Sequence, residues 1–329
     1  NNSSQIHYYY TLRHNLRIKN VKTSYICIAI KQKDILNKII AIKMTEPIRF
    51  TKMHGAGNDY IYVNTMAFPV RNPEELAIRL SAPHTGIGSD GLVLIGSSKI
   101  ADFSMRIFNA DGSEAMMCGN ATRCVGKYVY EHGMTDKTEV SLETNSGIKY
   151  LTLYVNEATN KVDAVKVDMG KAILKPAEIP VADDGDRFIA KPVVVDGVSY
   201  DMTCVSMGNP HAVVFLPEID SLDLEKMGPS FEHHPLFPNR VNTEFIRVID
   251  DHTLQMRVWE RGSGETFACG TGACAAAVAS VLNGYCKREQ EILIHLRGGD
   301  LRIIYHNDES VTMIGPATFI FEGKMEYPV

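Results

Sequence analysis

The chain has 329 residues, enough for two domains of ordinary size, and its 45% hydrophobic and 22% charged residues are typical of globular proteins. A net charge of -5 provides no basic footprint for nucleic acid, and no apolar run approaches the roughly 20 residues of a membrane-spanning helix. The seven cysteines are spread along the chain and do not form the pattern of a disulfide framework, so we expect a reducing, cytoplasmic setting.

Residues 1–43 differ in composition from everything that follows them. They hold eight Lys and Arg residues and a single acid, Asp34, and without them the chain has 26 basic and 38 acidic residues, a net charge of -12. We interpret this leader as upstream sequence that is not part of the native fold. A targeting segment and a genuine N-terminal extension are the alternatives. The fold prediction therefore starts at Met44.

The first half of the remaining chain predicts short strands around one helix. Runs rich in β-forming residues predict strands at residues 60–63, 91–95 and 105–108. A helix is expected from about residue 120 to 132, and Gly133 ends it. Alternating strand runs follow at 140–155. The polar stretch 156–161 has turn composition and predicts a boundary between two lobes.

The second half predicts the same order of elements. Strands are expected at residues 212–216, 245–248 and 254–259. An alanine-rich helix is expected at 273–283 and is closed by Gly284, and strand runs follow at 292–305.

An internal repeat relates the two halves at a constant offset of 151 residues. The sequence Met-Arg-Ile-Phe at 105–108 corresponds to Met-Arg-Val-Trp at 256–259, and Cys-Gly follows each of these methionines thirteen residues later. The same offset relates Gly57-Asn58 to Gly208-Asn209, Glu114 to Glu265, and Gly147 to Gly298.

The repeat predicts an α+β fold of two pseudo-symmetric lobes, each a strand-rich, barrel-like sheet around a central helix. We expect the N-terminal lobe at residues 44–160 and the C-terminal lobe at 161–315. The final residues, about 316–329, form a segment that can return to the first lobe.

Cys118 and Cys269 occupy equivalent positions directly before the two predicted helices. A helix N-terminus presents unpaired N–H groups and a partial positive charge. We therefore expect a lowered thiol pKa and a place for a carboxylate. Two such thiols across one cleft suit epimerisation, in which a thiolate removes an α-proton and a thiol protonates the opposite face. The other cysteines are expected to serve packing: Cys27, Cys124, Cys204, Cys274 and Cys286.

Sequence blocks in order along the chain carry a resemblance to a known family. They are FTKMHGAGND (50–59), GIGSDG (86–91), FNADGSE (108–114), CGN (118–120), GNPH (208–211), RVN (240–242), WERGSGET (259–266) and ACGTGA (268–273). From about Ile48 onwards the chain resembles the diaminopimelate epimerases. This resemblance implies an isomerase without PLP, any other cofactor or a metal. It implies interconversion of LL- and meso-diaminopimelate, on the route to lysine and peptidoglycan precursors. The expected partner is this small-molecule substrate, with neither nucleic acid nor membrane, and a homodimer is allowed.

The resemblance also implies roles for individual residues. Cys118 is the base and Cys269 the acid in the LL-to-meso direction. Glu260 binds the reacting amino group near Cys269, and Arg261 holds the distal carboxylate through its guanidinium fork. His211 lies near Cys118 and tunes its thiolate. The remaining expected substrate contacts are Asn58, Asn109, Gly119, Asn120, Asn209, Asn242, Gly270 and Thr271.

One position departs from the family pattern. Some members carry glutamine where this chain has Gly91, the residue that the offset relates to Asn242, so we expect a substrate contact to be lost or supplied by backbone or water. Three other functions stay open at this point: another two-cysteine racemase of proline or histidine type, a thiol hydrolase or transferase, and a non-catalytic binding protein.

Overall fold

The computed structural model describes residues 45–328, so the predicted leader at 1–43 lies outside the described residues. Residues 49–323 form one compact unit that carries both lobes and the candidate site, whereas residues 45–48 and 324–328 belong to a second unit. Within residues 45–328, no helix is long and apolar enough to cross a membrane.

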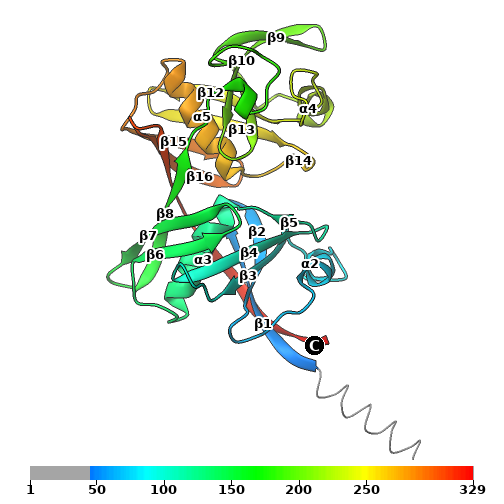
Figure 1. Cartoon of the computed structure of the whole chain (residues 1–329), viewed down its shortest axis with the longest axis vertical. Coiled ribbons are helices and arrows are strands. Elements are labelled where there is room, and N and C mark those ends of the chain that lie inside the picture. The colour runs from blue at the N-terminus through cyan, green and yellow to red at the C-terminus, as the bar shows by residue number, and fades with distance from the viewer. Residues whose placement is uncertain (1–44, 329) are drawn as a thin grey trace, which may run out of the picture. The chain divides into compact units, whose positions relative to one another are not determined.

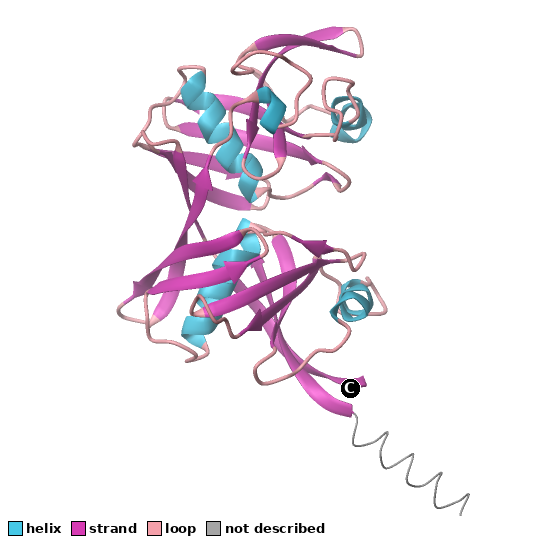
Figure 2. Cartoon of the chain, viewed as in Figure 1, coloured by secondary structure: helices cyan, strands magenta, loops and turns pink. Residues whose placement is uncertain are grey.

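In the first lobe, a curved sheet surrounds helix α3 (Figures 1 and 2). Its elements are β1 (Thr45–Gly55), β2 (Asn58–Asn64), α2 (Pro73–Ser81), β3 (Gly91–Gly96), β4 (Phe103–Asn109), β5 (Glu114–Ala115), α3 (Gly119–Glu131), β6 (Glu139–Thr144) and β7 (Gly147–Asn156), and β8 (Lys161–Lys171) follows them as the strand that joins the two lobes. The pairs β1–β2, β3–β4, β4–β5, β6–β7 and β7–β8 are antiparallel, and β2–β3 and β4–β6 are parallel.

The second lobe repeats this topology around helix α5 (Figure 1). Its elements are a 3-10 turn (Pro176–Glu178), β9 (Lys191–Val195), β10 (Val198–Ser206), β11 (Pro210–Phe215), α4 (Leu224–Glu232), β12 (Asn242–Asp250), β13 (Thr253–Glu260), β14 (Gly264–Glu265), α5 (Gly270–Leu282), β15 (Glu291–Leu296), β16 (Gly299–Tyr305) and β17 (Ser310–Gly315), and β18 (Thr318–Pro328) follows them at the end of the described chain. The pairs β11–β12 and β13–β15 are parallel, like their counterparts β2–β3 and β4–β6. The predicted fold class is confirmed.

The pairing of the strands shows the same 151-residue offset between the two lobes. Tyr60 pairs with Gly91 in the first lobe, and His211 pairs with Asn242 in the second. The predicted equivalence of Gly147 and Gly298 is wrong, because the second lobe has one additional residue after its helix. The β6–β7 hairpin closes on the pair Thr144–Gly147 and the β15–β16 hairpin on Leu296–Gly299, so Gly299 is the counterpart. Both of these glycines have a positive φ, which favours glycine.

The two central helices begin and end alike. Each has 13 residues, starts immediately after a cysteine in extended conformation, and is followed two residues later by Gly133 or Gly284 at positive φ. Helix α5 is rich in alanine, a strong helix former, and is buried on all sides, as expected for a helix at the centre of a sheet. Because the helices are fixed in the core, the two cysteines that precede them are held firmly.

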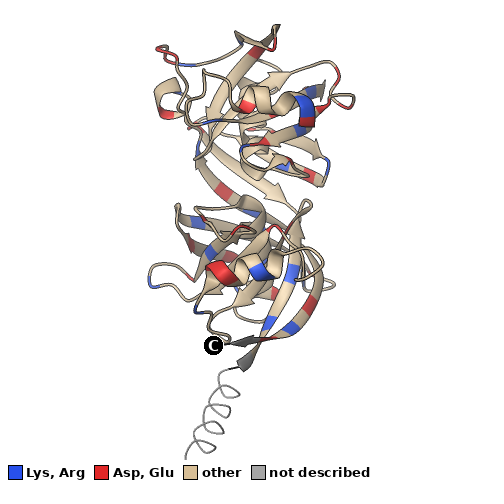
Figure 3. Ribbon diagram, turned by 90° about the vertical axis from the view of Figure 1, so that its right-hand side faces the viewer, with Lys and Arg blue, Asp and Glu red and all other residues tan. Residues whose placement is uncertain are grey.

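Strand β8 connects the lobes, since it pairs with β7 through Leu151–Val167 and with β17 through Val165–Gly315. Near the end of the chain, β18 returns to the first lobe: the Glu322 carboxylate lies 2.9 Å from Nε2 of His132, at the end of α3. We propose a boundary at residue 160, in the turn between β7 and β8, with the segment after residue 315 assigned to the first lobe. Acidic and basic residues are interspersed over both lobes in the view of Figure 3.

Candidate active site

A cavity of about 550 Å³ is lined by residues of both lobes. Its size is in the range of small-molecule sites. The structure brings most of the expected site residues to this cavity: Asn58, Asn109, Cys118, Gly119, Asn120, Asn209, Glu260, Arg261, Cys269, Gly270 and Thr271. Asn242 and His211 are buried and do not line it.

Cys118 is the N-cap residue of α3 and is half-buried in the cavity wall. Its Sγ donates a hydrogen bond to Oδ1 of Asn58, 3.4 Å away. Nδ2 of Asn58 donates in turn to Asp90 at 2.6 Å, which fixes which side of the amide faces the thiol. The backbone N–H groups of Ala121 and Asn120, in the first turn of α3, favour the thiolate and lower the pKa of Cys118.

Cys269 is the N-cap residue of α5 and is 5% exposed. Its Sγ accepts the N–H of Gly272 at 3.3 Å and lies 3.4 Å from Oγ1 of Thr271. The charge of Glu260 raises the pKa of this thiol, and the Glu260 carboxylate accepts a hydrogen bond from the Thr266 hydroxyl at 2.5 Å. Cys269 therefore has a carboxylate neighbour where Cys118 has the neutral amide of Asn58.

The expectation of lowered thiol pKa values is wrong for both cysteines. Burial raises the pKa of the Cys118 thiol, and the N–H groups of Asn120 and Ala121 lower it only in part. Burial, followed by the charges of Glu260 and Glu244, raises the pKa of Cys269 well above its usual value. The helix-start effect has the predicted sign, but desolvation of a thiolate in this cavity outweighs it.

The Glu260–Arg261 loop is held by Asn242. Oδ1 of Asn242 accepts the backbone N–H of Arg261 at 2.9 Å, and its Nδ2 donates to the carbonyl of Pro210. The guanidinium of Arg261 donates to the carbonyl of Asn239. Asn242 thus acts on the cavity through the loop that it positions, since its own side chain does not reach the wall.

His211 is fully buried, and both of its ring nitrogens have partners. Nδ1 lies 2.7 Å from Glu244 and Nε2 lies 3.0 Å from Oδ1 of Asn209, a residue of the cavity wall. The contacts within the described part of the chain therefore join His211 to Asn209 rather than to Cys118. Its expected tuning of Cys118 stays a prediction.

Several cavity residues carry no motif and were not predicted. Tyr60, Lys149 and Lys171 line the wall together with the thioethers of Met169 and Met207. The repeat could have indicated Tyr60, because the offset of 151 relates it to His211. Lys149 comes from β7, where alternation predicts the strand but not which of its residues face a site. Lys171 comes from β8, a strand that the sequence analysis did not predict.

Gly91 cannot be replaced by a longer side chain on this backbone. A Cβ there would lie 2.1 Å from the carbonyl oxygen of Phe108 and 3.0 Å from the ring of Tyr60. The glutamine that some family members carry at this position is therefore excluded by close packing, and the Tyr60 ring occupies the adjacent space.

We expect Gly91→Ala to destabilise the fold by about 1–3 kcal/mol, because the added methyl group must displace backbone. Thermal unfolding measures this as a lowered Tm. Gly96→Ala in the same strand is the matched control, since its Cβ would meet only the hydroxyls of Ser104 and Thr65 and the smaller shift is expected there. Equal Tm values for wild type and Gly91→Ala would contradict the prediction.

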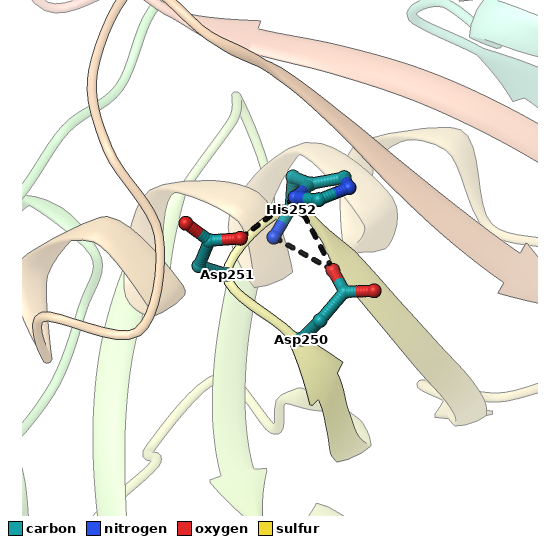
Figure 4. Close-up of side chains that lie close together, drawn as sticks. All are labelled: Asp250, Asp251 and His252. Carbon is teal, nitrogen blue, oxygen red and sulfur yellow. Dashed lines mark hydrogen bonds and ion pairs between the residues drawn. The ribbon is translucent and has the colours of Figure 1, made fainter.

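A separate cluster of possible ligands lies in the turn between β12 and β13 (Figure 4). Asp250, Asp251 and His252 are exposed, and Nδ1 of His252 lies 2.7 Å from Asp251. Acidic turns of this kind are common without an ion, so we assign no role to it.

The fold first defines the class of proteins that share this architecture. It is similar to a hydroxyproline epimerase from Agrobacterium vitis, with a TM-score of 0.64, 15% identity, and coverage of 86% of this chain and 93% of that one. It is also similar to a phenazine biosynthesis protein of the PhzF family from Bacillus anthracis, with a TM-score of 0.60, 17% identity and coverage of 85% and 99%. At these identities the likeness concerns the fold.

The sequence then defines the family. The diaminopimelate epimerase family model matches residues 50–175 and 203–320. A diaminopimelate epimerase from Acetivibrio thermocellus is 58% identical over 280 residues, which are 85% of this chain and 99% of that protein. One from Methanococcus maripaludis is 52% identical over 280 residues, which are 85% and 100% of the two chains. The chain belongs to the diaminopimelate epimerase family.

Proposed function

We propose that the protein interconverts LL- and meso-diaminopimelate, on the route to lysine and peptidoglycan precursors. The observation that carries this proposal is a single cavity lined by two N-cap cysteines from equivalent positions of two lobes. Family membership supports the choice of substrate, and the same membership supports a cytoplasmic location.

In the LL-to-meso direction, the Cys118 thiolate takes the α-proton and becomes a thiol. The electron pair left on the α-carbon is delocalised into the carboxylate. The Cys269 thiol then gives its proton to the opposite face and becomes a thiolate. The reverse direction exchanges these roles, so one turnover moves a proton between the two sulfurs and the pair titrates as a unit.

The helix starts support stabilisation of the intermediate. Backbone N–H groups at Gly119 and Asn120 in α3, and at Gly270 and Thr271 in α5, belong to residues of the cavity wall. N–H groups at two helix starts stabilise charge that grows on an α-carboxylate during proton removal. Gly119 and Gly270 also let both helix starts pack against Met313, since a Cβ would lie 2.6 Å from its Cε at Gly119 and 3.3 Å from its Sδ at Gly270.

Charges in the wall suit the rest of the substrate. We assign the reacting ammonium group to Glu260 and the distal carboxylate to Arg261, both of which line the cavity. Asn58, Asn109 and Asn209 supply amide groups that orient the substrate, and Asn242 holds the Arg261 loop.

The decisive experiment is incubation of the wild-type protein with LL-diaminopimelate in heavy water. We expect loss of the α-proton signal in NMR spectra together with meso product that carries deuterium at one centre. Proline, hydroxyproline and histidine are the comparison substrates. Turnover of one of these without turnover of LL-diaminopimelate would favour another racemase and contradict the assignment.

A further inference from the structure

Arg123 is the largest side chain in the described chain that is fully buried, and it lies in the second turn of α3, close behind Cys118. Its hydrogen bonds go to neutral acceptors only: Oδ1 of Asn120 at 2.9 Å, the carbonyl oxygens of Gly119 and Pro316 at 3.3 and 3.1 Å, and Sδ of Met313 at 3.4 Å. Among the ion pairs of residues 45–328, none involves this guanidinium. A buried cation of this kind is costly unless an anion compensates it.

The surrounding backbone is built to hold the guanidinium. A Cβ on Gly55 would lie 2.9 Å from Nη2, and a Cβ on Gly315 would lie 2.9 Å from Nε. A cation near a helix N-terminus also opposes the partial positive charge there. The guanidinium is therefore tightly enclosed, and the helix start supplies no negative charge to balance it.

A chain of hydrogen bonds leads from Arg123 to both cysteine loops. Asn120, whose Oδ1 accepts from Arg123, donates through Nδ2 to Oδ1 of Asn58 at 3.3 Å, the same atom that accepts from the Cys118 thiol. Nδ2 of Asn120 also lies 3.4 Å from the carbonyl oxygen of Ala268, directly before Cys269. Arg123 therefore fixes the amide that joins the two reacting loops.

The second lobe has no such cation. The offset of 151 relates Arg123 to Cys274, and it relates Asn109 and Val93 to Glu260 and Glu244. The first lobe thus places a cation behind its thiol, whereas the second places two carboxylates around its own. Burial and the charge of Glu260 raise the pKa of Cys118, and the charge of Arg123 acts in the opposite direction. Burial and the charges of Glu260 and Glu244 all raise the pKa of Cys269, and no cation in the described part of the chain opposes them there.

We propose that Arg123 is a positioning residue that makes Cys118, rather than Cys269, the thiol that ionises first in the free enzyme. It does so through its uncompensated charge and through its hold on Asn120. This inference rests on the proposed function for its meaning in catalysis, but the ionisation itself can be measured without turnover.

Other titratable groups also face Cys118 and have to be considered in any pH dependence. Glu260 opposes its ionisation from β13. The remaining groups near Cys118 or in the cavity wall are Tyr60, Tyr62, Cys124, Cys269, Lys149 and Lys171. None of these is altered by a substitution at residue 123, so a change in the ionisation of Cys118 reports on Arg123.

The experiment follows the rate at which iodoacetamide alkylates Cys118 as a function of pH, with Cys118 and Cys269 resolved by peptide mass spectrometry. Arg123→Gln removes the charge but keeps a hydrogen-bond donor, and Arg123→Met removes both. We expect the Cys118 midpoint to rise by about one pH unit or more in each variant. We also expect the acidic limb of kcat/KM to move to higher pH by a similar amount. Arg123→Met should lose at least tenfold more kcat than Arg123→Gln, because it also releases Asn120.

Arg302→Met, an exposed arginine of β16, is the control and should leave the midpoint unchanged. Circular dichroism identifies which variants fold, and either neutral variant is sufficient for the test. A folded Arg123→Gln or Arg123→Met protein with the wild-type Cys118 midpoint would overturn the inference. If the wild type does not turn over diaminopimelate while the midpoint still shifts, the proposed function fails and the inference stands.

Discussion

Replacement of either Cys118 or Cys269 by serine is expected to lower epimerisation by about 10³-fold or more, because a serine hydroxyl does not ionise near neutral pH and cannot act as the base. The two variants should nevertheless differ from an inactive protein. With Cys118 intact, Cys269→Ser should exchange the α-proton of the LL substrate with solvent deuterium without inversion. With Cys269 intact, Cys118→Ser should do the same at the D centre of the meso substrate. NMR in heavy water and chiral chromatography measure exchange and inversion separately.

Cys204→Ala is the matched control for this pair. Cys204 is buried in β10 and does not line the cavity, so we expect its substitution to leave kcat nearly unchanged. Two-thiol chemistry would be wrong if Cys269→Ser epimerised within tenfold of the wild type while Cys118→Ser did not. That result would favour a thiol hydrolase or transferase with one essential cysteine.

Glu260→Gln is expected to lower kcat/KM by about 100-fold, because the substrate ammonium group loses a charge-assisted hydrogen bond. Both directions must lose the same factor, since a substitution cannot change the equilibrium between the free stereoisomers. The carboxylate raises the pKa of both thiols, so its neutral replacement should also move the acidic limb of kcat/KM to lower pH. The shift has the opposite sign to the one expected for Arg123→Gln.

The measurement for Glu260 is the pH profile of kcat/KM in both directions. Glu225→Gln, in the exposed part of α4, provides the control for the loss of one negative charge at a distance from the cavity. A Glu260→Gln protein with wild-type kcat/KM would show that this carboxylate does not bind the reacting substrate.

Much of the architecture could be predicted because it occurs twice. Cys118 and Cys269 have the same spacing from the strands before them and from the glycines after them. This spacing locates both helices to within about three residues. The crossover helices α2 and α4 were not predicted, because each has only nine residues and Pro229 lies inside α4. Both helices connect parallel strand pairs, which require a crossover connection, so pairing rules would have indicated them only once the topology was known.

The site was less predictable than the fold. Family motifs identify the residues that reach the cavity. They do not reveal that Asn242 and His211 are buried outside it and contact the wall residues Arg261 and Asn209. The ionisation of the two thiols could not be obtained from their helix positions, because burial by residues from both lobes determines it. Arg123 follows Cys118 by five residues, and on sequence alone it would be assigned to a solvated helix face. Only its complete burial in the structure indicates that it has another role.

The correspondence between most strands of the two lobes has a consequence for the protonation of the two thiols. A protein with two identical lobes would carry two identical thiols, each equally ready to lose its proton, and its resting state would be divided between two equivalent protonation forms. The two lobes differ in residue type at three pairs of positions related by the offset, 60 with 211, 109 with 260 and 123 with 274. These differences make the surroundings of the two thiols unequal. On our proposal, the differences in charge between the lobes determine which of the two cysteines is the thiolate before substrate binds.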